Sequence, residues 1–69
     1  MVEEIVQIWI DELCEEHGVS ELNYLHDDII NAQIEEAEVN IDNCNMWGDK
    51  FGVACNEYFI ECLEDCLSH

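Results

Sequence analysis

The sequence has almost no positive charge. It contains no arginine and a single lysine, Lys50, against 18 acidic residues, which gives a formal net charge of −17. A surface of this charge repels DNA, RNA and anionic membranes, whereas basic protein surfaces attract it. The composition therefore argues against direct binding to nucleic acid or membrane, and it predicts a basic protein as the partner.

Long apolar runs and a basic N-terminal segment are also lacking. Acidic residues interrupt every apolar run, so none approaches the roughly 20 residues of a transmembrane helix. The start of the chain, Met1-Val-Glu-Glu, lacks the positively charged region of a signal peptide. The five cysteines are an odd number, which argues against a disulfide framework when no export signal is present. We therefore expect a cytoplasmic protein with free thiols.

Proline is absent, and we find no low-complexity linker or internal repeat. A chain of 69 residues is long enough for one domain, which we place at residues 1–69. Apolar residues at helical spacing predict helices at about residues 2–17, 21–40 and 50–67. The predicted fold class is therefore all-α, a small three-helix bundle with short connections.

Local signals refine these helices. Gly18 suits the left-handed position after a helix, and Ser20 and Asp49 suit the N-caps of the second and third helices. Residues 43–48 are interpreted as a loop, and a strand at residues 39–41 is the weaker alternative. The second helix has two adjoining apolar faces, so we expect it to be the central one. In the third helix, Gly52 weakens the first turn, and the expected buried side chains are Phe51, Cys55, Tyr58 or Phe59, Cys62, Leu63 and Cys66.

Acidic residues gather on one side of each predicted helix at 100° per residue. The positions are Glu4, Asp11 and Glu15 on the first helix, Glu21, Asp28, Glu35 and Glu38 on the second, and Glu57, Glu61 and Glu64 on the third. Any surface helix has a polar face, but here like charges stand four residues apart, and each such pair destabilises by about 0.2–0.5 kcal/mol. Solubility needs a net charge of only about 2–8. The excess indicates that the negative field itself serves a function.

The amount of charge matches a stretch of nucleic acid. Duplex DNA carries one charge per roughly 1.7 Å, so 17 charges correspond to about 29 Å of duplex, close to the expected length of the bundle. In size, charge and helical content, the whole chain resembles the small acidic proteins of phages and mobile elements that block restriction enzymes or CRISPR effector complexes. The resemblance implies a stoichiometric inhibitor that mimics DNA or RNA in the basic groove of a nucleic-acid-binding protein, in the cytoplasm of a host cell.

Two apolar side chains lie within the acidic sectors. Ile8 falls among the acids of the first helix, and Tyr24 falls near Glu21 and Asp28. Single exposed apolar residues are common, but an aromatic side chain in a ring of carboxylates can anchor an interface. We include Ile8 and Tyr24 in the predicted partner-binding surface. Trp47 is a further candidate, and the alternative for its side chain is to cap the core.

Metal binding and catalysis have weaker sequence signals. The possible zinc ligands are Cys14, His17, Cys44, Cys62, Cys66 and His69, but their spacing matches no strong zinc motif, and cysteines in apolar stripes are usually buried. No arrangement of nucleophile, base and acid stands out, and a short chain has little room for an enclosed pocket. We therefore predict no enzyme, metal or cofactor. The alternatives to mimicry are a small acidic adaptor, which includes a homodimer, and a zinc-stabilised mini-domain.

Overall fold

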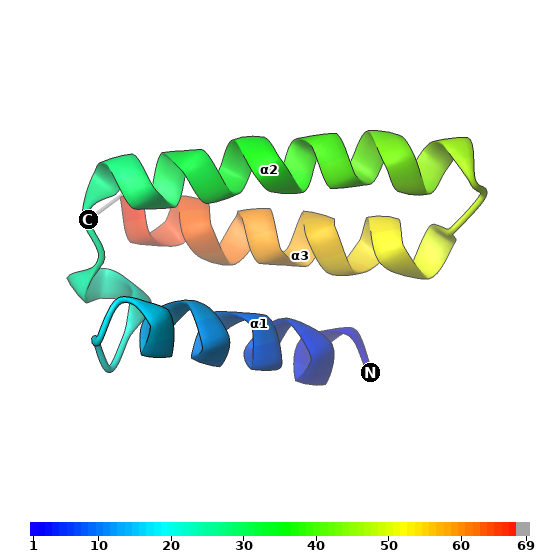
Figure 1. Cartoon of the computed structure of the whole chain (residues 1–69). Coiled ribbons are helices and arrows are strands. Elements are labelled where there is room, and N and C mark those ends of the chain that lie inside the picture. Colours follow the sequence, from blue (N-terminus) through cyan, green and yellow to red (C-terminus); the bar gives the residue numbers. More distant parts are fainter. Residues whose placement is uncertain (68–69) are drawn as a thin grey trace.

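The protein is an all-α, small three-helix bundle in the computed structural model, which describes residues Met1–Leu67 (Figure 1). Its elements are α1 (Val2–Glu16), a short 3-10 turn η1 (Leu22–Tyr24), α2 (Asp27–Met46) and α3 (Lys50–Leu67). Residues 39–41 are helical within α2, so the alternative of a strand there is wrong. No helix within residues 1–67 combines the length and the apolar character needed to cross a bilayer.

The central helix is α3, not the second helix as we predicted. It packs against both α1 and α2, and in Figure 1 it lies between them, antiparallel to α2 and parallel to α1. The prediction overestimated the apolar surface of the second helix. Leu22 and Leu25 precede α2, and Ala32 is exposed, so the apolar surface of α2 is narrower than its sequence indicated.

The prediction that the second helix begins at residue 21 with Ser20 as its N-cap is wrong. Leu25 and His26 have extended backbones, with ψ angles of 144° and 145°, and α2 begins only at Asp27. His26 is the N-cap, because its Nδ1 accepts a hydrogen bond from the backbone N–H of Asp28 at 3.2 Å. The apolar residues before it still serve the fold, since Leu22 and Leu25 are buried in the core.

The helices α1 and α2 end in the same way. Gly18 and Gly48 have φ angles of +68° and +72°, and the following N–H groups of Val19 and Asp49 donate to the carbonyls of Cys14 and Cys44. This is the Schellman pattern, which satisfies carbonyls at a helix end. It confirms the prediction for Gly18. Since α2 continues to Met46, the interpretation of residues 43–48 as a loop is wrong for residues 43–46.

The core lies along α3. Val6, Ile30, Cys55 and Leu63 are its most deeply buried large side chains, and Phe59 packs edge to face against Trp9, with ring centroids 5.7 Å apart. Between the two aromatic candidates in α3, Phe59 is buried and Tyr58 is 37% exposed. The predicted burial of Phe51 is wrong: its side chain is 46% exposed, in the first turn of α3.

The first turn of α3 explains the glycine at position 52. Asp49 is the N-cap, as predicted, because its Oδ1 accepts the backbone N–H of Gly52 at 2.9 Å. A Cβ on Gly52 would lie 2.5 Å from Asp49 Oδ2 and 2.6 Å from Cys44 Sγ. The glycine therefore lets the N-cap and the α2 side chain occupy this space.

We expect Gly52→Ala to destabilise the protein by about 1 kcal/mol. Alanine is the better helix former by about 1 kcal/mol, but loss of the N-cap costs about 0.5–2 kcal/mol and Cys44 must also move. Urea denaturation measures the difference. Cys44→Ala in the same chain should recover part of the loss, since it removes one of the two close contacts. A Gly52→Ala variant more stable than the parent would show that the side chains of Asp49 and Cys44 move away at little cost in free energy.

Candidate interaction surface

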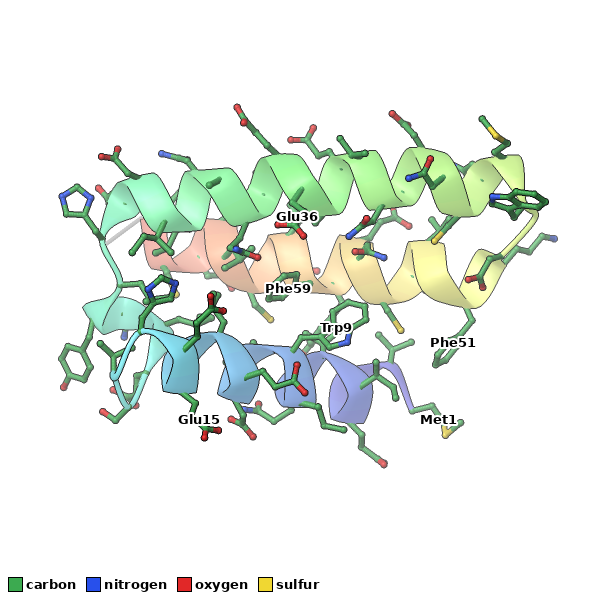
Figure 2. The ribbon with its side chains drawn as sticks, viewed as in Figure 1. Met1, Trp9, Glu15, Glu36, Phe51 and Phe59 are labelled. Carbon is green, nitrogen blue, oxygen red and sulfur yellow. The ribbon has the colours of Figure 1, made fainter. Side chains whose placement is uncertain are left out.

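The predicted partner-binding residues of the first helix share one exposed side of α1. Glu4, Asp11 and Glu15 are exposed, and Ile8 is 52% exposed. Figure 2 shows Glu15 pointing away from α3. Gln7 Nε2 donates to Asp11 Oδ1 at 2.9 Å. We call Glu4, Ile8, Asp11 and Glu15 the outer face of α1.

The residues predicted for the start of the second helix are arranged differently. Glu21 and Tyr24 precede α2, so they do not continue the acidic side of that helix as we expected. Tyr24 is 66% exposed in η1. Asp28 lies in the first turn of α2, where a carboxylate interacts favourably with the helix dipole, and its Oδ2 is 3.6 Å from His26 Nδ1.

Three of the predicted acids meet across α2 and α3. Glu38, Glu57 and Glu64 line a shallow hollow of about 330 Å³ together with the apolar side chains of Ile34, Ile41 and Ile60. Glu35 and Glu61 are exposed but do not line it. We call this the α2/α3 hollow, and it combines an acidic rim with an apolar floor.

Positive charge is scarce near these carboxylates. The terminal ammonium of Met1 lies 4.0 Å from Glu4 Oε1, and both groups are highly exposed, so this pair contributes little. None of α1, α2 and α3 has a basic residue in its last turn, where a cation would be favourable. The net charge of −17 spread over the 34 Å long axis corresponds to about one charge per 2.0 Å, against roughly 1.7 Å in duplex DNA.

A larger concavity, absent from our sequence predictions, lies between α1 and α2 above α3. This α1/α2 groove has a volume of about 690 Å³. Its lining includes Trp9, Glu12 and Glu16 from α1, Gln33, Glu36, Asn40, Asn43 and Cys44 from α2, Asp49 at the N-cap of α3, and Gly52, Asn56 and Phe59 from α3. Figure 2 shows Trp9 and Glu36 reaching from the two outer helices toward Phe59.

The sequence contains a signal for this groove. Gln33, Glu36, Asn40 and Asn43 are spaced by three, four and three residues, which places them on one side of a helix. Three of them are neutral amides, unlike the carboxylates that occupy the other exposed side. This stripe of amides marks a surface with a different role.

Cys14 and Cys55 are buried, and Cys44, Cys62 and Cys66 are partly buried. Burial raises the pKa of the Cys14, Cys55 and Cys66 thiols, and nearby carboxylates add to the effect. A raised pKa keeps a thiol protonated at neutral pH, whereas both nucleophilic attack and zinc binding need the thiolate. In the part of the chain from Met1 to Leu67, no three His, Cys, Asp or Glu side chains are grouped to hold a metal ion. The candidate ligand His69 lies outside the described residues.

Comparison with known proteins identifies no relative of this chain. No protein family model matches the sequence, and neither a curated protein nor a solved structure is significantly similar to it.

Proposed function

We propose that this protein is a stoichiometric inhibitor of a nucleic-acid-binding protein or complex, of the anti-CRISPR or antirestriction type, that acts as a DNA or RNA mimic in the host cytoplasm. The observation that carries the proposal is the density of charge along the bundle. About one negative charge per 2.0 Å over a 34 Å axis approaches the charge of one turn of B-DNA, which is about 34 Å long.

The helical scaffold gives this charge a fixed arrangement. The outer face of α1 and the α2/α3 hollow carry carboxylates on different helices, so a basic groove can contact more than one helix. Complementary fields accelerate encounter and disfavour partners of the wrong charge. Ile8, on the outer face of α1, and Ile34, Ile41 and Ile60, in the hollow, add apolar contacts that a nucleic acid backbone does not offer.

A second candidate function, an acidic adaptor without mimicry, is favoured by one end of the bundle. Met46 and Trp47 are 77% and 83% exposed at the end of α2, and Phe51 is 46% exposed at the start of α3. Figure 2 shows Met1 at the same end as Phe51. Exposed apolar residues of this kind are typical of protein contacts, and a homodimer formed through this end belongs to the same alternative.

Competition with nucleic acid separates the two functions. A partner captured with the tagged protein is loaded with a labelled duplex or guide RNA, and this protein is then added. We expect release of the label at a fixed molar ratio, and affinity that falls at least about tenfold between 0.1 and 0.4 M salt, since many charges are involved. Formation of an equally stable complex on the loaded partner would rule out mimicry and favour the adaptor.

Neutral substitutions then locate the contact. Glu57→Gln, Glu61→Gln and Glu64→Gln together remove three charges from α3, and Asp28→Asn, Glu35→Gln and Glu38→Gln remove three from α2. The set that weakens binding more lies closer to the partner. Unchanged affinity with both sets would exclude a role for these faces.

A further inference from the structure

The α1/α2 groove differs from the other acidic surfaces because it has an aromatic floor. Trp9 and Phe59 contact each other there at 5.7 Å between ring centroids, and both side chains line the groove. The faces of such rings attract cations, tryptophan most strongly. Phe59 is buried and Trp9 is partly exposed, so the Trp9 ring offers both an apolar surface and a favourable site for positive charge.

Hydrogen-bond acceptors surround this floor. The carboxylates of Glu12 and Glu16 line it from α1, and that of Glu36 lines it from α2. The lining contains no lysine, arginine or histidine, so these carboxylates have no cation of their own within the groove. The groove is complementary to a positively charged group.

Asn56 adds a neutral acceptor at the base of the groove. Its side chain is only 6% exposed, and its Nδ2 is already used in a 2.8 Å hydrogen bond to the Gly52 carbonyl. Asn56 lines the groove, and the hydrogen bond of Nδ2 leaves Oδ1 as the acceptor of this amide. An amide oxygen of this kind can accept a hydrogen bond from an incoming donor.

The distribution of acceptors selects among cations. Nowhere in residues 1–67 do three His, Cys, Asp or Glu groups come together to hold a metal ion. The groove carboxylates come from α1, from α2 and from Asp49, and Asp49 already accepts the Gly52 N–H as the N-cap of α3. A second copy of this chain could offer only Lys50 and the terminal ammonium of Met1 against its own net charge of −17. A guanidinium presents five donors in a plane, stacks on aromatic rings and sheds water more readily than an ammonium.

We propose that the α1/α2 groove binds an arginine-bearing segment of the partner protein, with the arginine stem on Trp9 and the guanidinium among Glu12, Glu16 and Glu36. The volume of about 690 Å³ is within the usual range of about 300–1,000 Å³ for a binding site. This inference goes beyond mimicry, because it assigns a side chain and a pocket and holds equally for an adaptor.

Two triple variants with the same change of charge test the proposal. The groove variant carries Glu12→Gln, Glu16→Gln and Glu36→Gln. The control carries Glu4→Gln, Asp11→Asn and Glu15→Gln on the outer face of α1. The probe is a capped glycine-serine peptide that contains one arginine. The same peptide with lysine in place of arginine is the control. Binding is followed by NMR of the full-length protein. Circular dichroism checks that both variants are folded.

We expect the arginine peptide to shift the side-chain amide signals of Gln33, Asn40 and Asn56 and the indole signal of Trp9. The groove variant should bind it about tenfold more weakly, which corresponds to loss of about 1.4 kcal/mol, and the control should change affinity less than about threefold. The lysine peptide should bind more weakly than the arginine peptide, because a guanidinium stacks on aromatic rings and donates two parallel hydrogen bonds to a carboxylate.

Other results separate this inference from the proposed function. Equal weakening by both variants, or equal binding of the two peptides, would overturn the groove as an arginine site and leave mimicry intact. Shifts confined to the outer face of α1 would also overturn it. If the captured partner still holds nucleic acid in the presence of this protein but the groove variant alone loses that partner, mimicry fails and the groove inference holds.

Discussion

We expect a large fraction of the molecules to be unfolded at 25 °C in the Leu63→Ala variant. The Leu63 side chain is fully buried, with 0% exposure, on the helix that contacts α1, α2 and η1. A buried leucine truncated to alanine costs about 2–5 kcal/mol, and a core of this size supplies only about 3–5 kcal/mol. Far-UV circular dichroism and urea denaturation measure the loss directly.

An exposed site provides the control for this substitution. Val39 lies on α2 with 57% exposure, and Val39→Ala should change the free energy of unfolding by about 0.5 kcal/mol or less, as surface substitutions usually do. If the Leu63→Ala variant has the same melting temperature as the parent, packing of Leu63 on α3 does not stabilise the core.

Added salt is expected to stabilise the protein. Like charges four residues apart occur within the observed helices at Asp11 and Glu15, Glu12 and Glu16, Glu38 and Asp42, Glu57 and Glu61, and Glu61 and Asp65. At about 0.2–0.5 kcal/mol for each pair, the five pairs together cost about 1–2.5 kcal/mol, and screening recovers much of this. Raising the salt from 0.1 to 1 M shortens the Debye length from about 10 to 3 Å, and the melting temperature should rise by about 5–10 °C.

Two single substitutions test whether the salt effect comes from these pairs. Glu61→Gln removes a charge that belongs to two of them, so it should raise the melting temperature at 0.1 M salt and reduce the response to salt. Glu3→Gln removes the same charge from the first turn of α1, where it interacts favourably with the helix dipole, so it should lower the melting temperature. Changes of the same sign in both variants would show that net charge alone matters.

The parts of the fold that depend on local pattern could be predicted from the sequence. The helix α1 forms where the spacing of apolar residues predicts it, with Val6 and Leu13 buried, and the predicted bounds of the third helix agree with Lys50–Leu67. Gly18 and Asp49 have the predicted end positions. Each of these features is determined by residues within one or two turns of one another.

The features that depend on distant contacts could not be predicted in the same way. Leu22 and Leu25 continue the apolar spacing of the following helix, but they are not part of it. Leu22 is in η1 and Leu25 directly follows η1, and both side chains are buried. The chain leaves the helical conformation here because it must cross from the end of α1 to the start of α2. The centrality of α3 and the α1/α2 groove follow from which helices touch. The periodicity of one helix does not indicate which other helices it contacts. The amides of Asn40 and Asn43 do indicate which side of α2 lines the groove.

The order of the helices in the chain has a consequence for synthesis. The helix α1 packs on α3, so the core that covers its apolar stripe is complete only after the ribosome has made Leu63. The distance from Glu16, the last residue of α1, to Leu63 is 47 residues, which takes roughly 2–9 s at about 5–20 residues per second. During that time the acids on α1, from Glu3 to Glu16, keep nascent chains apart by repulsion. We therefore expect the charge that opposes folding of the finished bundle to limit aggregation of its first helix before the bundle exists.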